Sequence, residues 1–295
     1  MSTFTAPATL DAALVAVDSG AVPVAGGTDL VVGHRQGKRP LPADLVAIDR
    51  IAELATIDDG SGLTLGALAS HDAIRRHATV LDRYTALADA SAIVGSEATR
   101  STGTIGGNVM NASPAADTVG PLICFDAVAL LRSVNGHRRV PVAELALGPG
   151  RTVAAGNELL VALELGDPPA GSGSAYVRLE YRRHMEIAVV GAAALVALDG
   201  DTVTHCRIAV TAVAPTIRRL AVAEQALATV ADIAAAAQAA AGDIDPISDL
   251  RGSASYRRAM TAVITRRAIA TAIARARGES VPVPASDATF AQTGA

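Results

Sequence analysis

Aromatic side chains are scarce in this 295-residue chain, which has four Tyr, three Phe and no Trp. Surfaces that stack nucleic-acid bases are built on aromatic rings, so the shortage counts against such a platform and against a ring-lined carbohydrate cleft. The charge balance also counts against nucleic-acid binding, because 25 Lys and Arg residues against 29 Asp and Glu residues leave a net charge of -4. Without a basic excess, we expect no nucleic acid among its partners.

Cysteine is rarer still, since Cys124 and Cys206 are the two in the sequence and show no CxxC spacing. Iron–sulfur clusters and four-cysteine zinc sites need several closely spaced cysteines, so this chain carries neither and has no disulfide framework. His71, His77 and His184 are isolated, without HxH or HExxH spacing. We expect them at the surface or at helix caps, and we expect no metal site.

Long apolar runs are also missing. The most apolar stretch, residues 187–198, has twelve residues, fewer than the roughly 20 that a membrane-spanning helix needs. The N-terminus lacks a basic region followed by an apolar run, so no signal peptide is expected. With 50% hydrophobic residues, the sequence predicts a cytoplasmic protein with a sizeable core and about two domains.

The first half of the sequence alternates helix and strand patterns. Strand–helix–strand order within a short stretch is typical of a parallel α/β unit, and we expect one small unit of this kind in about the first fifty residues. The expected elements are helix 9–18, strand 22–25, a helix from Asp29, strand 45–48, strand 63–67, helices 70–74 and 84–94, and strands 127–132 and 158–165. Residues 95–118 show no helical stripe and are expected to form a long polar loop, of the kind that is usually functional.

The second half begins after a Pro- and Gly-rich break at 166–173, which is the expected domain boundary. Strand patterns at 175–181, 187–198 and 203–213 then form a meander. Two helical stretches follow, at 219–241 and 255–277. These elements make up a second domain at 173–278, and residues 279–295 are expected to form a flexible tail.

Two glycine-containing segments are candidates for a binding site, namely 24–30 (VAGGTDL) and 104–108 (TIGGN). Paired glycines permit a positive φ and remove Cβ atoms, so backbone N–H groups can point into one concavity that suits a diphosphate. Neither segment fits GxGxxG or the GxxxxGK[ST] phosphate loop, and each taken alone is more typical of a tight turn. Asp117 follows the second segment and could accept hydrogen bonds from sugar hydroxyls.

Taken together, these segments resemble those of a known family. VAGGTDL at 24–30 and TIGGNVMNASPAAD at 104–117, supported by YRRHMEIAVV at 181–190 and VAPTIRR at 213–219, are similar to motifs of the FAD-binding medium subunit of the molybdenum hydroxylases. That group includes carbon monoxide, xanthine and nicotine dehydrogenases. The resemblance implies an α+β fold. It consists of a vanillyl-alcohol-oxidase (PCMH)-type FAD domain of two α/β subdomains, about 1–55 and 56–172, and a C-terminal three-stranded sheet with helices.

The resemblance also implies a cofactor site between the two subdomains. Residues matching the FAD loops are Val24, Ala25, Gly26, Gly27, Thr28, Asp29 and Leu30 in the first, and Thr104, Gly106, Gly107 and Asn108 in the second. Asp117 matches a further FAD contact, and Leu160 and Arg178 match positions near the isoalloxazine ring. A cation there would stabilise the reduced flavin. The residues alone leave open a solvated strand-face charge for Arg178 and ordinary core packing for Leu160.

In function, the resemblance implies electron transfer without acid–base or nucleophilic residues in this chain. A large partner subunit would hold the molybdenum cofactor, a small one would hold two 2Fe-2S clusters, and the complex would be a dimer of heterotrimers. Electrons would pass through FAD to NAD+, oxygen or a quinone. The alternatives are a free-standing flavin oxidoreductase and a scaffold without FAD. The substrate, with N-heterocycles slightly preferred, and the roles of Tyr181, Arg182 and Arg183 stay open.

Overall fold

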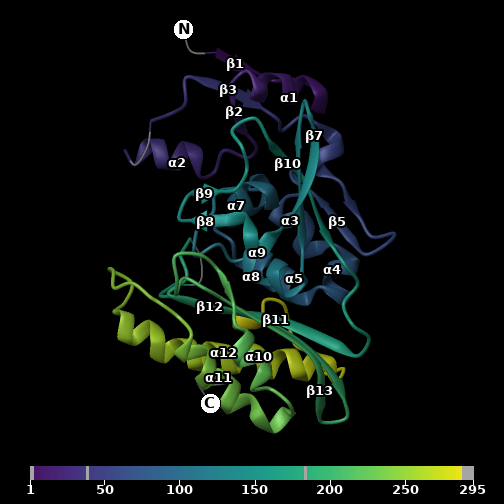
Figure 1. The fold of residues 1–295 in the computed structure, drawn as a ribbon, viewed down its shortest axis with the longest axis vertical. Coiled ribbons are helices and arrows are strands. Elements are labelled where there is room, and N and C mark those ends of the chain that lie inside the picture. The colour runs from purple at the N-terminus through teal and green to yellow at the C-terminus, as the bar shows by residue number, and fades with distance from the viewer. Residues whose placement is uncertain (1–2, 38–39, 183–184, 288–295) are drawn as a thin grey trace.

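The computed structural model describes residues 3–37, 40–182 and 185–287. Three parts follow one another along the long axis, from the small N-terminal sheet at one end to the C-terminal sheet and helices at the other (Figure 1). The first part is the expected parallel α/β unit, with strand order β1-β3-β2. Its elements are β1 (Thr3–Thr5), α1 (Leu10–Asp18), β2 (Val22–Val24), α2 (Leu30–Arg35) and β3 (Asp44–Ala47).

Helix α1 shows how local sequence signals build this part. The Thr9 hydroxyl caps the helix by accepting a hydrogen bond from the Ala12 N–H, at 3.4 Å, as N-cap residues do. Leu10, Leu14 and Val17 are buried on one face, the helical spacing of an amphipathic helix. The chain leaves the helix at Gly20, whose φ of +96° favours glycine.

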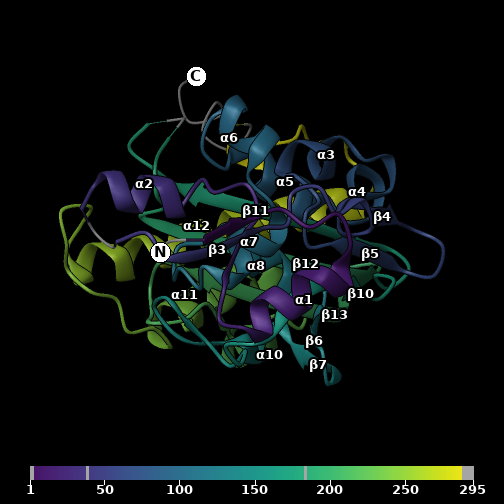
Figure 2. The same cartoon turned by 90° about the horizontal axis from the view of Figure 1, so that it is seen from above.

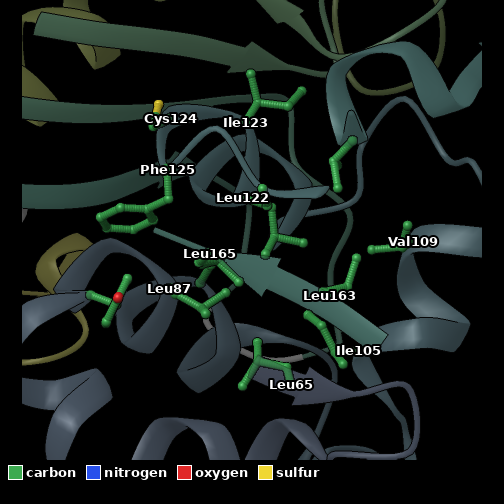
Figure 3. Close-up of a cluster of buried hydrophobic side chains, with 14 of the residues drawn as sticks. Leu65, Leu87, Ile105, Val109, Leu122, Ile123, Cys124, Phe125, Leu163 and Leu165 are labelled. Atoms are coloured by element: carbon green, nitrogen blue, oxygen red, sulfur yellow. The ribbon is translucent and has the colours of Figure 1, made fainter. Parts of the chain in front are cut away.

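The middle part is built on an antiparallel sheet of strand order β4-β5-β10-β6-β7. The strands are β4 (Ile57–Asp58), β5 (Leu63–Gly66), β6 (Val128–Ser133), β7 (Gly136–Pro141) and β10 (Leu159–Leu165), with the hairpin β8 (Ala146–Gly148) and β9 (Arg151–Thr152) beside them. The helices are α3 (His71–Arg76), α4 (Ala78–Arg83), α5 (Thr85–Ile93), α6 (Glu97–Thr102), α7 (Ile105–Met110), α8 (Val119–Cys124) and α9 (Val142–Leu145), and η1 (Ala52–Ala55) is a 3-10 turn. The sheet carries the main core, with Leu65, Leu163, Leu122 and Phe125 converging from strands and helices (Figure 3).

The expected long loop at 95–118 is wrong, because the segment contains α6 and α7. Each helix has six residues, too short to show an apolar stripe. Both are started by side-chain caps: Ser96 accepts from the Thr99 N–H at 3.2 Å, and Thr104 accepts from the Gly107 N–H at 3.1 Å. Capping, which sequence periodicity does not register, therefore creates helix here.

The C-terminal part has a four-stranded antiparallel sheet in the order β11-β12-β13-β14, not the expected three strands. The additional strand β14 consists of Arg218–Arg219 and pairs with Ala209 and Val210, so it is too short to show alternation. The other strands are β11 (Ser172–Leu179), β12 (Val190–Asp199) and β13 (Thr202–Thr211). Helices α10 (Ala221–Gln225), α11 (Ile233–Gly242) and α12 (Ala254–Ala276) gather on the side of the sheet away from the middle part (Figures 1 and 2).

The single helical stretch expected at 219–241 is also broken. Thr229 and Asp232 form a capping box that starts the 3-10 turn η2 (Val230–Asp232). The preceding Ala228 carbonyl accepts from the Val203 N–H at 2.9 Å, which ties the break to β13. A local cap and one tertiary hydrogen bond thus outweigh the helix propensity of the alanine-rich run.

The C-terminal segment, defined here as residues 279–287, departs from the flexible tail expected at 279–295. Ala285 and Ser286 are buried. The Ala285 N–H donates to the fully buried Asp89 of α5 at 2.9 Å, and Asp89 also pairs with Arg275 of α12 at 2.6 Å. This ion pair joins the middle part to the C-terminal part and holds the segment between them. Residues 288–295 lie outside the described residues.

Candidate functional site

The two glycine segments, about 75 residues apart in sequence, lie against each other. A Cβ added to Gly26 would lie 2.7 Å from the carbonyl carbon of Thr102 and 3.3 Å from the Cα of Gly103. Such distances leave room for glycine only. A side-chain hydrogen bond from Asn111 Nδ2 to Asp29 Oδ1, at 3.3 Å, adds a second contact between the segments. The structure thus brings the predicted loops together.

The first loop offers backbone donors. Among residues 3–37, 40–182 and 185–287, no acceptor pairs with the N–H groups of Gly26, Gly27 or Thr28. Gly27 has a φ of +66°, the left-handed conformation that turns consecutive N–H groups toward one side. The loop joins Val24, which ends β2, to Leu30, which begins α2. Ala25, the residue directly after β2, is half-buried. Three unpaired donors in a partly exposed loop fit a phosphate oxygen.

The second loop contributes side chains instead, because its own N–H groups are used internally. The Gly106 N–H donates to Ala67 O at 2.9 Å, and the Gly107 N–H donates to Thr104 Oγ1. Thr104 keeps its hydroxyl hydrogen for another acceptor. Asn108 Oδ1 accepts from the Thr118 hydroxyl at 2.7 Å, which orients the amide so that its Nδ2 hydrogens remain available.

Asp117 and Arg178 form one buried cluster. Arg178 is fully buried, so the alternative of a solvated strand-face charge is wrong. Its Nη1 donates to Asp117 Oδ2 at 2.7 Å, and the Tyr176 hydroxyl donates to Asp117 Oδ1 at 2.7 Å. The Arg178 Nη2 pairs with Glu180 and donates to Ile93 O at 3.3 Å, while its Nε is buried without a partner among the described residues.

The electrostatics of this cluster follow from its burial. Burial raises the pKa of the Asp117 carboxyl, and the charge of Arg178 and the Tyr176 hydrogen bond oppose that rise. Burial by itself lowers the pKa of Arg178, but the carboxylates of Asp117 and Glu180 outweigh it, so the pKa lies above its usual value. The guanidinium therefore stays charged while both Asp117 oxygens are taken by protein donors.

Leu160 does not join this cluster. It lies in β10 opposite Leu131 and is 2% exposed in the core of the middle part. Ordinary core packing, one of the two readings open from the sequence, describes its surroundings in this structure.

Sequence reasoning missed several partners of these residues. Tyr176, Glu180 and Thr211 belong to the cluster, with Thr211 Oγ1 3.2 Å from the Tyr176 hydroxyl. The strand alternation placed Tyr176, Arg178 and Glu180 on one face, which was the available signal. His71 was expected at the surface or a cap; it is buried, and its backbone N–H donates to Gly103 O at 3.2 Å.

Tyr181 and Arg182, the first residues of the motif at 181–190, are exposed. The Tyr181 ring is 66% exposed, and its hydroxyl donates to Arg251 O at 2.7 Å. Arg182 pairs with Glu186 at 3.4 Å. Arg183 and His184 lie outside the described residues. Tyr181 therefore presents most of its ring to solvent, and the role of this motif stays open.

Metal sites and membrane-spanning helices are absent from the described residues, 3–37, 40–182 and 185–287. No group of His, Cys, Asp or Glu side chains there could hold a metal ion. No helix in that part of the chain is both long and apolar enough to cross a bilayer.

Comparison with known proteins assigns the family. Residues 1–168 match the model of the FAD binding domain in molybdopterin dehydrogenase, and residues 175–272 match that of the CO dehydrogenase flavoprotein C-terminal domain. The chain belongs to this family of FAD-binding medium subunits. As such it is a subunit of molybdopterin-dependent dehydrogenases, which are oxidoreductases, and the predicted resemblance is confirmed.

Individual relatives cover most of the molecule. The carbon monoxide dehydrogenase medium chain of Hydrogenophaga pseudoflava is 35% identical over 79% of this chain and 83% of its own length. The 6-hydroxypseudooxynicotine dehydrogenase complex subunit alpha of Paenarthrobacter nicotinovorans is 34% identical over 86% and 87%.

Solved structures agree in fold. The carbon monoxide dehydrogenase of H. pseudoflava superposes with a TM-score of 0.88 at 33% identity, over 92% of this chain and 97% of that chain. The quinoline 2-oxidoreductase of Pseudomonas putida 86 gives 0.87 at 27% identity, over 94% and 98%.

Proposed function

We propose that this chain carries electrons through FAD between an iron–sulfur partner and an external acceptor. The observation that carries the proposal is the junction of the two glycine loops. There the loop that carries the unpaired N–H groups of Gly26, Gly27 and Thr28 packs against Thr102 and Gly103. The next residues along the chain include Thr104 and Asn108, which keep donors available. Backbone and side-chain donors of this kind suit a diphosphate.

Residues outside this junction would act on the rest of the cofactor. The bound FAD supplies the ability to take up electrons singly and release them in pairs. Arg178 would place a fixed positive charge beside the ring system, and Asp117 would hold that charge in position through its 2.7 Å ion pair. The chain's own residues thus bind, orient and electrostatically tune the cofactor.

The partners and substrate belong to the same proposal. We infer a large subunit with a molybdenum cofactor and a small subunit with two 2Fe-2S clusters, arranged as a dimer of heterotrimers. The acceptor would be NAD+, oxygen or a quinone. An N-heterocycle is the favoured substrate class, supported by the likeness to a quinoline oxidoreductase. Carbon monoxide is the alternative, since the carbon monoxide enzyme shares 33% identity with this chain against 27% for the quinoline enzyme.

The proposal is tested by substitution in the second loop. A Cβ at Gly107 would lie 3.0 Å from Thr104 Oγ1, so Gly107→Leu should disturb both the cap and the cofactor's approach. We expect the Kd for FAD to rise at least about tenfold over wild type, which corresponds to a loss of about 1.4 kcal/mol in binding free energy. Gly156→Leu, at a position with no atom within 4 Å, serves as the matched control.

Two outcomes would contradict the proposal. If Gly107→Leu retains FAD as well as wild type does, the second loop does not hold the cofactor. If the wild-type chain shows no flavin absorbance even after FAD is added, the scaffold alternative holds. Co-purification of proteins that bring molybdenum and iron would support the proposed partners.

A further inference from the structure

One buried cation in the cluster is shared by two carboxylates. Arg178 pairs with Asp117 through Nη1 and with Glu180 through Nη2. The Arg178 side chain is fully buried, and those of Asp117 and Glu180 are 10% and 12% exposed. Burial of a charge is costly unless it is paired, so each carboxylate stabilises the guanidinium. When both carboxylates are ionised, the three charges leave one net negative charge.

The two carboxylates differ in how firmly they are held. Asp117 has one oxygen on Arg178 and the other on the Tyr176 hydroxyl. Glu180 directly follows β11 and bonds to Arg178 alone among the side chains of the described residues. Of the pair, Glu180 is thus the carboxyl that can change protonation state without breaking a second side-chain hydrogen bond.

Water can reach the neighbourhood of Glu180. A polar pocket of about 290 Å³ is lined by, among others, Ile93 and Asp287. The Ile93 carbonyl accepts from Arg178 Nη2, and Asp287 acts electrostatically on Glu180. The pocket is therefore linked to the cluster through Ile93 and Asp287, and the Glu180 side chain is itself 12% exposed, so Glu180 can exchange a proton with solvent.

We propose that Glu180 is a positioning residue for Arg178 that also sets, through its own protonation state, the net charge presented to the flavin. The inference rests on the proposed function, in which Arg178 stands beside the ring. With Glu180 ionised the cluster is anionic and opposes electron uptake. With Glu180 neutral the cluster is balanced and electron uptake becomes easier.

The surroundings of Glu180 give the pH range. Burial raises the pKa of its carboxyl, Arg178 opposes the rise, and Asp117 and Asp287 add to it. These three groups, from β11, the residues before α8 and the C-terminal segment, are the charged groups with the largest effects on Glu180. The charge change is therefore expected above the usual range of a glutamate.

The test compares flavin potentials of the full chain, purified with FAD and any accompanying subunits, between pH 5 and 8. Glu180→Gln keeps an acceptor oxygen for Arg178 and removes the charge. At neutral pH we expect this variant to favour the reduced flavin about tenfold, a rise of about 30 mV for a two-electron couple. The difference should shrink toward pH 5, as wild-type Glu180 takes up a proton.

Glu186→Gln is the matched control. Glu186 lies, like Glu180, between β11 and β12, its side chain is 16% exposed, and it pairs with Arg182 rather than Arg178. The flavin potential of Glu186→Gln should therefore follow the pH dependence of the wild type. Equal potentials for wild type and Glu180→Gln at every pH would overturn the inference while leaving FAD binding intact. Should Glu180→Gln lose its flavin, an acid-range inflection in the wild-type curve supports the inference and a featureless curve overturns it. A wild-type chain without flavin would instead overturn the proposed function, and the inference with it.

Discussion

Gly26→Ala should separate the two loops that meet at the candidate cofactor site. The added methyl would lie 2.7 Å from the carbonyl carbon of Thr102 and nearer still to its oxygen, whereas ordinary contact begins at 3.4 Å. Restoring contact requires the loops to part by at least about 0.7 Å, more than the roughly 0.5 Å within which a binding constellation must be held. Both obstructing atoms belong to the backbone, so no side-chain rotation relieves the overlap.

The cost follows from this overlap. Overpacking of a tight contact costs about 1–3 kcal/mol, and a loss of about 2 kcal/mol in FAD binding corresponds to roughly 30-fold in Kd. FAD titration of the apoprotein, followed by flavin fluorescence, measures the Kd, and circular dichroism measures Tm. Gly156→Ala is the control, because its Cβ would meet nothing within 4 Å. A Gly26→Ala variant with wild-type Kd and Tm would refute the reasoning.

Two further predictions concern stability. Asp89→Asn should lower the free energy of unfolding by about 3–5 kcal/mol in urea, because it leaves the buried Arg275 charge unpaired, whereas Asp201→Asn, in an exposed pair with Arg277, should cost less than about 1 kcal/mol. Burial, and then Arg100, lowers the pKa of His71 from 6.5 to about 4. The contribution of His71 to folding stability is therefore complete above pH 6.5 and is lost as the pH falls through 4. Between pH 7 and pH 5 the free energy of unfolding of the wild type should fall by about 2 kcal/mol more than that of His71→Gln.

Each of these has a contradicting result. Equal losses for Asp89→Asn and Asp201→Asn would mean that the interdomain ion pair adds no more than a surface pair. Equal pH dependence of wild type and His71→Gln, measured by urea unfolding at both pH values, would mean that His71 titrates normally in the folded state.

Much of the fold could be predicted from patterns along the sequence. Helix 9–18 and the parallel strands around 22–25 and 45–48 were predictable because periodicity and glycine stops act locally. Strand β14 and the helices α6 and α7 were not, since two-residue pairing and side-chain caps leave no periodic trace.

The candidate site could likewise be predicted only in part from the sequence. The glycine segments could be found because paired glycines mark unusual backbone wherever they meet. That they meet through Gly26 and Thr102 is a tertiary fact, as is the burial of Arg178, whose carboxylate partner Asp117 lies 61 residues earlier in the chain. Strand alternation gave Arg178 a face but could not tell whether that face was covered.

The β11 border of the C-terminal sheet bears on association between molecules. A border strand with unpaired N–H groups can pair with a strand of another molecule. Along β11, however, the Tyr176 N–H donates to Asp89 at 3.0 Å and the Arg178 N–H donates to Ser286 at 2.9 Å. At the opposite border, β14 is two arginines long. Side chains thus occupy backbone N–H groups along β11, and β14 is too short to pair with a further strand. Neither border of the sheet therefore favours pairing with a strand of another molecule.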